Sequence, residues 1–198
     1  MQSFKLRGVI PPVPTIVDQT GAFDPKGMAA LVEREIASGI HGMLILGSGG
    51  EFCHMSLAMR KEVAEFCVRQ VAGRVPVLLG IGASATAEVI ELGQHAKACD
   101  ADAVLVVNPY YATLSRAALI QHYKAVAAAV DLPILLYNFP GLTGQELTVD
   151  LVLELALACP NIVGIKDTVD TVSHTRALVT TVKGARPDFL VFSGFDEY

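Results

Sequence analysis

The feature that most constrains the fold is a series of short apolar runs separated by amphipathic segments. The runs begin roughly every 30 residues, the length of one strand–helix unit. Most are nearly continuous in Val, Ile and Leu, the pattern of strands that are buried on both faces of a parallel sheet. We predict seven such strands, at Gly8–Thr15, Gly42–Leu46, Pro76–Gly80, Ala103–Val107, Pro133–Tyr137, Ile162–Ile165 and Phe189–Phe192.

The segments between these runs carry apolar residues at helical spacing, as Met59, Val63 and Phe66 do. Alternating strands and helices allow either an open doubly wound sheet or a TIM (β/α)8 barrel. Seven evenly spaced strands with polar or Gly-rich ends favour the barrel. Because no linker or compositional break divides the chain, we predict a single α/β domain over residues 1–198. Helix N-caps are predicted at Ser56, Ser115 and Thr148.

A closed barrel needs eight strands, and the sequence ends at Tyr198, directly after the seventh. We therefore expect a barrel that is truncated after its seventh strand, with its C-terminal part missing. The first and seventh strands of such a barrel would expose their edges. We expect the 198-residue chain to be poorly stable for this reason.

Composition and charge exclude several classes of protein. A hydrophobic fraction of 52% with 18% charged residues argues against disorder. A net charge of −5 argues against a nucleic-acid partner, since no excess of cations is available to neutralise phosphates. No apolar run approaches the ~18 residues of a membrane span, and the N-terminus lacks the pattern of a signal peptide.

The cysteines and histidines show no ligand pattern. The four cysteines are scattered without a CxxC pair, so we expect free thiols and a cytoplasmic protein. The five histidines lack metal-ligand spacing, and we predict no metal. Gly80–Ala85 matches G-x-G-x-x-A, but it follows the third predicted strand instead of the first, which disfavours a dinucleotide site.

Functional residues of either architecture gather at the carboxyl ends of strands. Lys166 follows Ile162–Ile165 and would project from an apolar barrel mouth. Only about one part in a thousand of an ordinary lysine is neutral at pH 7, but desolvation would lower its pKa and make it a nucleophile. A lysine that simply ends a strand and reaches water fits the same position, so the spacing alone leaves both interpretations open.

Two further strand ends are candidates for chemistry. Tyr137 ends the strand before Lys166, and neighbouring strands lie about 4.8 Å apart, so the two side chains can meet and exchange protons. A tyrosine that caps the core fits equally well. Gly47–Glu51 can turn backbone N–H groups inward around an anion, and Ser48 adds a hydroxyl. A carboxylate, a phosphate or a plain turn would all suit this loop.

Four strand-end segments, taken in order, resemble the class I aldolases of the dihydrodipicolinate synthase and N-acetylneuraminate lyase superfamily. The resemblance covers essentially the whole chain and about the first two-thirds of a family member. It implies that Lys166 forms a Schiff base with a 2-keto acid, without any other cofactor. The segments are Gly47–Glu51, Asn108–Tyr111, Tyr137–Pro140 and Gly164–Asp167.

The resemblance also implies roles for other residues. Tyr137 would be the general acid/base, and Ser48 would relay protons towards Tyr111. A tyrosine at that last position reaches into the adjacent subunit in the family, which implies a homodimer or homotetramer. Ser48 and the backbone N–H of Gly49 would hold the substrate carboxylate, where family members often have Thr-Thr. We also assign Thr168, which directly follows the lysine motif, to substrate binding.

The substrate expectation rests on one departure from the dihydrodipicolinate synthases and one similarity to the sialic acid lyases. Dihydrodipicolinate synthases that resemble this chain carry an arginine where Leu142 stands, so lysine biosynthesis is disfavoured. Sialic acid lyases bind sugar hydroxyls with a stretch similar to the one here, which assigns Gly194, Asp196 and Glu197 to substrate binding.

The combined motifs most resemble 2-keto-3-deoxy-sugar-acid aldolases of carbohydrate acid catabolism. These lyases cleave the gluconate or pentonate analogue to pyruvate and glyceraldehyde or glycolaldehyde. N-acetylneuraminate lyase, hydroxy-oxoglutarate aldolase and sugar-acid dehydratase are alternatives that share the same iminium. A non-catalytic barrel that binds a keto acid is the alternative from a different class.

Overall fold

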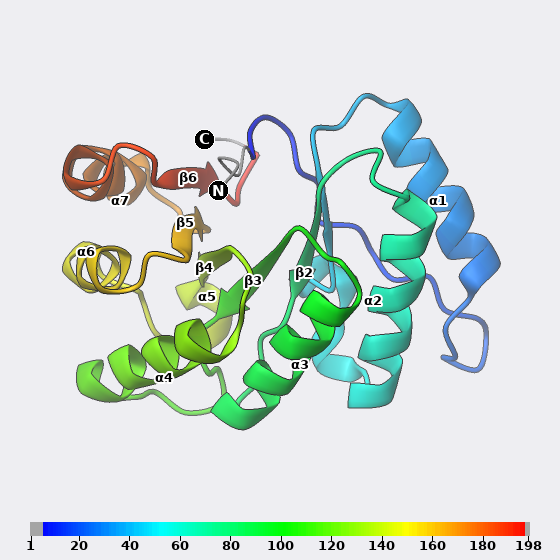
Figure 1. The fold of residues 1–198 in the computed structure, drawn as a ribbon, viewed down its shortest axis with the longest axis horizontal. Helices are drawn as coiled ribbons and strands as arrows, with labels where there is room; N and C mark the ends of the chain where they lie inside the picture. Colours follow the sequence, from blue (N-terminus) through cyan, green and yellow to red (C-terminus); the bar gives the residue numbers. More distant parts are fainter. Residues whose placement is uncertain (1–5, 197–198) are drawn as a thin grey trace. The chain divides into compact units, whose positions relative to one another are not determined.

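The structure is a computed structural model, which describes residues 6–196 (Figure 1). By their internal contacts, the residues form two compact units. The first unit contains Met1–Gly80 and His95–Val104, and the second contains Ile81–Gln94 and Leu105–Tyr198. Lys166 and Tyr137 both belong to the second unit, whereas Ser48 belongs to the first.

Within the described residues, six strands form one sheet in the order in which they occur along the chain. The pairs β1–β2, β4–β5 and β5–β6 are parallel. Every residue of the first four strands is buried, as expected for strands that are covered on both faces. The strands are β1 (Met43–Ile45), β2 (Val77–Gly80), β3 (Ala103–Val107), β4 (Ile134–Asn138), β5 (Ile162–Asp167) and β6 (Leu190–Ser193).

The prediction of a strand at Gly8–Thr15 is wrong. This segment makes only an isolated parallel bridge, between Pro12 and Leu44. Val13 N donates to Leu44 O over 2.9 Å, and Leu44 N donates to Pro11 O over 3.0 Å. The prolines of the segment have no N–H to donate, so a continuous ladder cannot form beside β1.

The last two strands differ from their predicted form. Strand β5 continues to Asp167, so Lys166 lies within the strand and not after it. Strand β6 is partly exposed along its length, and Ser193 is exposed, unlike the residues of β1 to β4. Among the described residues, β6 has no strand on its outer side, whereas β1, at the other end of the sheet, is bridged there by Pro12.

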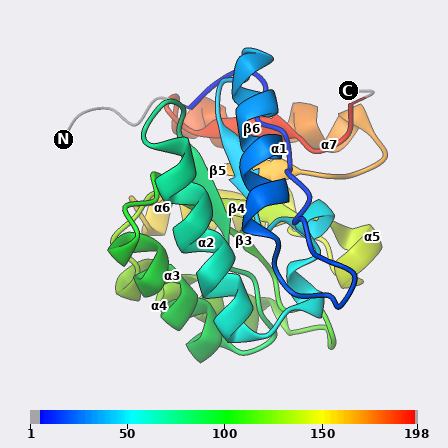
Figure 2. The ribbon, with the colours of Figure 1, turned by 90° about the vertical axis from the view of Figure 1, so that its right-hand side faces the viewer.

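The first unit contains two helices that pack against each other, α1 (Pro25–Ala37) and α2 (Leu57–Val71). They lie side by side in Figure 2. The Asp24 carboxylate caps α1 by accepting hydrogen bonds from two backbone N–H groups of its first turn. Ser56 accepts from Met59 N over 3.2 Å, which confirms that predicted N-cap. Two short 3₁₀ turns lie between β1 and α2, η1 (Ser48–Gly50) and η2 (Phe52–His54).

The remaining helices follow strands β2 to β5. Ser115 accepts from Ala118 N over 3.2 Å, which confirms the second predicted N-cap. Thr148 precedes α6 as predicted, but its hydroxyl donates to the Asp150 side chain and makes no cap bond. Helix α6 packs on both α4 and η3. The elements are α3 (Thr86–Ala98), α4 (Arg116–Ala129), α5 (Pro140–Thr143), α6 (Val149–Ala158), α7 (Val172–Ala177) and the π-helical turn η3 (Leu178–Lys183).

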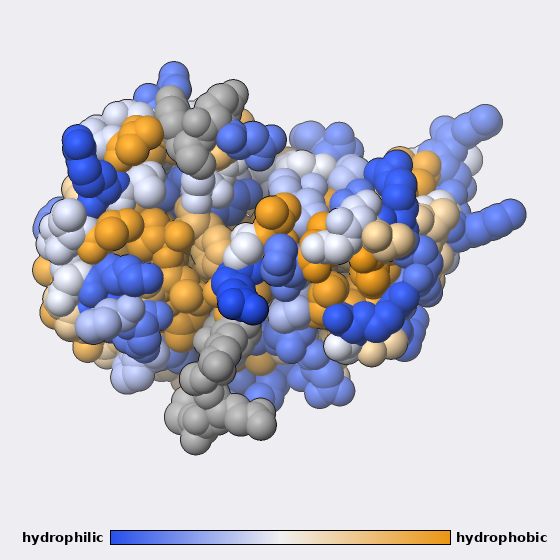
Figure 3. Space-filling model, turned by 90° about the horizontal axis from the view of Figure 1, so that it is seen from above, coloured by the Kyte–Doolittle hydropathy of each residue, from blue (hydrophilic) through white to orange (hydrophobic). Residues whose placement is uncertain are grey.

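The surface mixes hydrophilic and hydrophobic residues on the face shown in Figure 3. Among residues 6–196, no helix is long and apolar enough to cross a membrane. All four cysteines are free thiols.

Candidate functional site

Lys166 and Tyr137 meet near the carboxyl ends of β5 and β4. The two residues are register partners of the parallel pair. Lys166 Nζ lies over the Tyr137 ring, 4.6 Å from the ring centroid, a distance at which the ring face attracts an ammonium group. Tyr137 is buried and Lys166 is partly buried. The predicted meeting of these two side chains therefore occurs.

Burial changes the acidity of the lysine. Desolvation lowers the pKa of Lys166 from 10.5 to about 8, and the Asp196 charge opposes this shift by raising it. A change of this size weakens the ammonium form by roughly 3 kcal/mol relative to the amine. Roughly a tenth of the side chains would then be neutral amine at pH 7, enough for a nucleophile.

Thr168 and Gly194 lie directly beside the lysine. Thr168 N donates to Asn138 O over 2.8 Å, which fixes the backbone. Its Oγ1 is buried and, within the described part of the chain, makes no hydrogen bond. A Cβ at Gly194 would collide with Thr168 Oγ1 and lie 3.2 Å from Lys166 Cε. Only glycine fits there without a shift.

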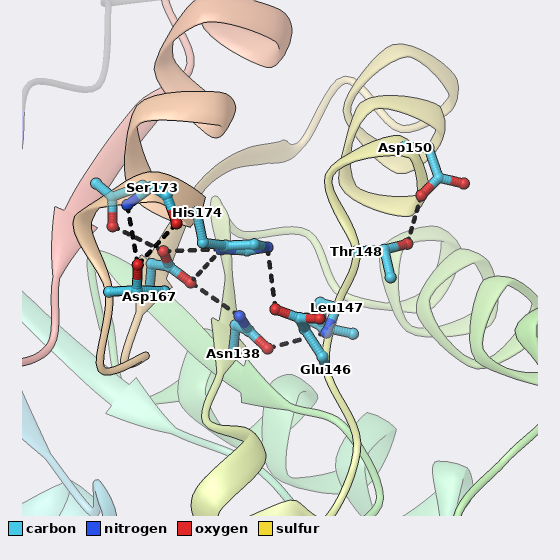
Figure 4. A network of polar contacts seen from close by, with 10 residues as sticks. Asn138, Glu146, Leu147, Thr148, Asp150, Asp167, Ser173 and His174 are labelled. Atoms are coloured by element: carbon cyan, nitrogen blue, oxygen red, sulfur yellow. Dashed lines mark hydrogen bonds and ion pairs between the residues drawn. The ribbon is translucent and has the colours of Figure 1, made fainter.

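A buried polar network begins one residue after Tyr137 on β4 and one residue after Lys166 on β5 (Figure 4). Asn138 Nδ2 donates to Asp167 Oδ1 over 2.8 Å, and Asn138 Oδ1 accepts from Leu147 N over 2.9 Å. His174 Nδ1 lies 3.0 Å from both Asp167 oxygens, and Thr175 Oγ1 donates to Oδ2 over 2.8 Å. None of these five residues has a role that we predicted from the sequence. Polar Asn and Asp at the ends of two apolar strands were the available signal.

The predicted anion loop lies in the first unit. Gly50 N donates to Gly47 O over 2.9 Å, and Glu51 N donates to Ser48 O over 3.0 Å, so the loop is a tight turn after β1. Ser48 is half-buried and Gly49 is exposed. The contact of these two residues with a substrate stays a prediction.

The other predicted residues lie on loops. Tyr111 follows β3 and is 95% exposed. Asp196 is exposed after β6 and raises the pKa of Lys166 by its charge. Glu197 lies outside the described residues. Leu142, which stands where an arginine was expected for lysine biosynthesis, is 59% exposed on α5.

One cluster of possible metal-ligating side chains was not predicted, because its only histidine is far in sequence from the other histidines. Glu65, His95 and Cys99 place their possible ligand atoms within 4.8 Å of one another. His95 Nε2 lies 2.9 Å from Glu65 Oε1, and Arg69 lies 3.9 Å from the other oxygen of that carboxylate. Burial, followed by the Glu65 charge, raises the pKa of the Cys99 thiol. The Glu65 carboxylate is thus shared by His95 and Arg69, beside a thiol whose pKa is raised.

The sequence of this chain is similar to those of known enzymes. The profile of the Dihydrodipicolinate synthetase family matches residues 5–198. YagE of Escherichia coli, provisionally named a 2-dehydro-3-deoxy-D-gluconate aldolase, is 49% identical over 197 residues. YjhH of the same species, provisionally named a 2-dehydro-3-deoxy-D-pentonate aldolase, is 46% identical over 194 residues. A 4-hydroxy-tetrahydrodipicolinate synthase of Phenylobacterium zucineum is 45% identical over 161 residues.

These matches cover 100%, 98% and 81% of the chain, respectively. The chain spans 65%, 64% and 54% of the length of these relatives.

Solved structures show the same fold. The crystal structure of YagE in complex with pyruvate superposes with a TM-score of 0.95 at 49% identity, over 96% of this chain and 64% of that one. The dihydrodipicolinate synthase of Aquifex aeolicus gives a TM-score of 0.92 at 34% identity, over 96% and 64% of the two chains. These matches, with six strands in chain order, confirm the predicted class of an incomplete (β/α)8 barrel.

Proposed function

We propose that this chain, which belongs to the dihydrodipicolinate synthetase family, carries the Schiff-base lysine and the proton-transferring tyrosine of a class I aldolase. The observation that carries this proposal is the Lys166 amine, held 4.6 Å from the centre of the Tyr137 ring. Its pKa of about 8 supports a nucleophilic role. The chemistry needs no metal or separate cofactor, because the iminium itself accepts the electron pair.

The proposed reaction begins when the neutral Lys166 amine attacks C2 of a 2-keto acid. Loss of water gives an iminium. Removal of the proton from the C4 hydroxyl then breaks the C3–C4 bond, the aldehyde leaves, and the bonding electrons form an enamine with the iminium carbon. Protonation at C3 and addition of water release pyruvate and the free amine. Tyr137, whose ring contacts the ammonium group, would transfer these protons.

For the substrate, we propose a 2-keto-3-deoxy sugar acid of the gluconate or pentonate type. The names of the two E. coli relatives support this class. The apolar, exposed Leu142 offers no cation for a second carboxylate. The buried Thr168 hydroxyl and the Asp196 carboxylate supply polar groups near the amine that suit a hydroxylated tail.

For the partner, we propose further copies of this chain. The exposure of the Tyr111 side chain, 95%, supports association through this loop, because a large aromatic side chain at a surface is typical of a contact site.

The first test is mass spectrometry after incubation with pyruvate and sodium borohydride. Trapping should add about 72 Da, since pyruvate condenses with loss of water and the imine is then reduced. Peptide mapping should place the adduct on Lys166, and Lys166→Ala should show none. Lys124→Ala, which removes an exposed lysine of α4, is the matched control. An adduct on another lysine, or none on the folded protein, would overturn the proposal.

A second assay addresses the substrate. Pyruvate released from 2-keto-3-deoxygluconate and from the pentonate analogue should exceed that released from N-acetylneuraminate by at least tenfold in kcat/KM. Binding of pyruvate without trapping would instead indicate a non-catalytic keto-acid-binding barrel.

A further inference from the structure

The Asp167 carboxylate is a buried charged group to which the proposed mechanism gives no role. Its side chain is completely inaccessible to solvent. A carboxylate in this environment must be compensated by hydrogen-bond donors or by an opposite charge. It is compensated by Asn138 on β4 and by His174 and Thr175 on α7.

The position of this carboxylate links it to the reactive pair. Asn138 and Asp167 are register partners, directly after the partners Tyr137 and Lys166. Because successive strand residues point to opposite faces, the Asn138–Asp167 bond lies on the face opposite to the lysine amine. The bond therefore ties β4 to β5 at the point where the reactive side chains must meet, without contacting them.

Backbone contacts extend this link towards the next strand. Gly194 N donates to Asp167 O over 2.8 Å, and Thr168 N donates to Asn138 O over 2.8 Å. Gly194 lies against both Thr168 and the lysine side chain, because a Cβ there would collide with Thr168 Oγ1 and lie 3.2 Å from Lys166 Cε. A displacement of Asp167 would therefore reach the lysine directly along the chain and through Gly194, which is bonded to the Asp167 carbonyl.

The same network holds two segments outside the sheet. His174 Nε2 lies 3.5 Å from Glu146 Oε1, an ion-pair distance without a hydrogen bond. Leu147 N donates to Asn138 Oδ1 over 2.9 Å. Figure 4 shows the side chains of Asn138, Asp167 and His174 directed towards one another, with Glu146 on the far side of the imidazole.

We propose that Asp167 is a positioning residue for Lys166, and that Asn138 and His174 hold its carboxylate so that the amine stays over the Tyr137 ring. This inference rests on the proposed function. Schiff-base formation requires the amine within about 3–3.5 Å of the carbonyl carbon, and a misplacement of about 1 Å can cost roughly 100-fold in rate.

The decisive variant is Asp167→Asn, which keeps the shape of the side chain but removes its charge. We expect the rate of pyruvate trapping at saturating pyruvate to fall by about 10- to 100-fold, with the concentration for half-saturation changed less than threefold. Circular dichroism identifies a temperature at which the variant is folded. Asp188→Asn, which alters an exposed carboxylate of the same unit, is the control and should trap at the unaltered rate.

A double-mutant cycle tests whether the network acts as one unit. Asn138→Ala should slow trapping as well, and the combined Asn138→Ala/Asp167→Asn variant should be no slower than the worse single variant within about threefold. Losses that multiply would show independent effects and overturn the link.

A catalysis-independent readout separates this inference from the proposed function. Reductive methylation with formaldehyde, followed across pH by peptide mass spectrometry, reports the ionisation of each lysine. Among residues 6–196, the titratable groups that face Lys166 are Tyr137 from β4 and Asp196 after β6. In Asp167→Asn the midpoint for Lys166 should move towards that of an ordinary lysine, while exposed Lys124 should not change.

If the unaltered protein traps no pyruvate but the Lys166 midpoint still moves in Asp167→Asn, the proposed aldolase function is rejected and the positioning role of Asp167 stands. Unaltered trapping and an unmoved midpoint in folded Asp167→Asn would overturn the positioning role alone.

Discussion

The two faces of the β4–β5 strand ends have opposite polar chemistry, although they are built from consecutive residues. On one face, the amine of Lys166 is desolvated and the nearby Thr168 hydroxyl has no hydrogen-bond partner in the described structure. On the other face, the Asp167 carboxylate accepts hydrogen bonds from three side chains. The lysine face thus has few polar contacts around its amine, whereas the face behind it holds a carboxylate whose oxygens are bonded to neighbouring side chains, an arrangement that supports a reactive group from behind.

The largest expected effect comes from Tyr137, which lies on the same face of the β4–β5 strand ends as Lys166. We call this the reactive face. Tyr137→Phe keeps the ring under the ammonium group but removes the O–H. Turnover of a 2-keto-3-deoxy sugar acid should fall by about 10²- to 10⁴-fold, while pyruvate is still trapped slowly. Steady-state kinetics and borohydride trapping measure the two steps. The control is Tyr123→Phe, which alters a buried tyrosine of α4; equal losses in both variants would contradict the assignment.

A substitution at Gly194 should damage the reactive face by overfilling it. In Gly194→Ala the new methyl group would collide with Thr168 Oγ1 and lie 2.8 Å from Thr168 Cβ, so we expect a loss of about 1–3 kcal/mol in unfolding free energy. Denaturant unfolding measures it. Gly184→Ala has open space around its methyl group and should have no such cost. The double variant Gly194→Ala/Thr168→Ala should regain part of the lost unfolding free energy, because the clashing hydroxyl is removed. If it regains none, the clash is not with Thr168.

The charge on Asp196 should set the pH at which the reactive face works. Because this carboxylate raises the pKa of Lys166, Asp196→Asn should lower that pKa below about 8. The amine would then be neutral at lower pH, and the midpoint of the trapping rate against pH should move down. An upward shift would mean that Asp196 does not act as a charge near the amine.

The smallest expected effect compares two buried threonines of the second unit. Thr143 Oγ1 donates to Phe139 O over 3.1 Å, whereas Thr168 Oγ1 has no partner in the described structure. Thr143→Val should therefore cost about 1 kcal/mol in unfolding free energy, and Thr168→Val should cost less or even stabilise. If Thr168→Val proves the more costly of the two, its hydroxyl is satisfied in the folded protein after all.

The sequence was informative where one physical signal dominated. Continuous runs of Val, Ile and Leu predicted β1 to β6 to within a few residues, because such runs are typical of strands that are buried on both faces. Strand β6 departs from this pattern, since it is partly exposed. The meeting of Tyr137 and Lys166 followed from their places at the ends of neighbouring parallel strands. Gly8–Thr15 failed because its apolar pattern hid the missing N–H groups of its prolines.

The supporting network could not be predicted in the same way. His174 and Thr175 reach Asp167 from helix α7, seven and eight residues further along the chain. Their contact depends on where that helix begins and on the rotamers of three side chains, and no residue period encodes these. A polar residue at a strand end marks a place to look, but its partners become visible only in three dimensions.

Burial of the Lys166 amine favours its reactivity but lowers the stability of the fold. At neutral pH, the ammonium form of Lys166 is disfavoured by roughly 3 kcal/mol relative to an exposed lysine, a large part of the stability of an ordinary domain. An apolar residue of similar length would fill the same space without this penalty. Laboratory evolution under selection for heat resistance alone would accordingly discard the lysine early, and its retention in a stabilised descendant would be a sign that activity had also been selected.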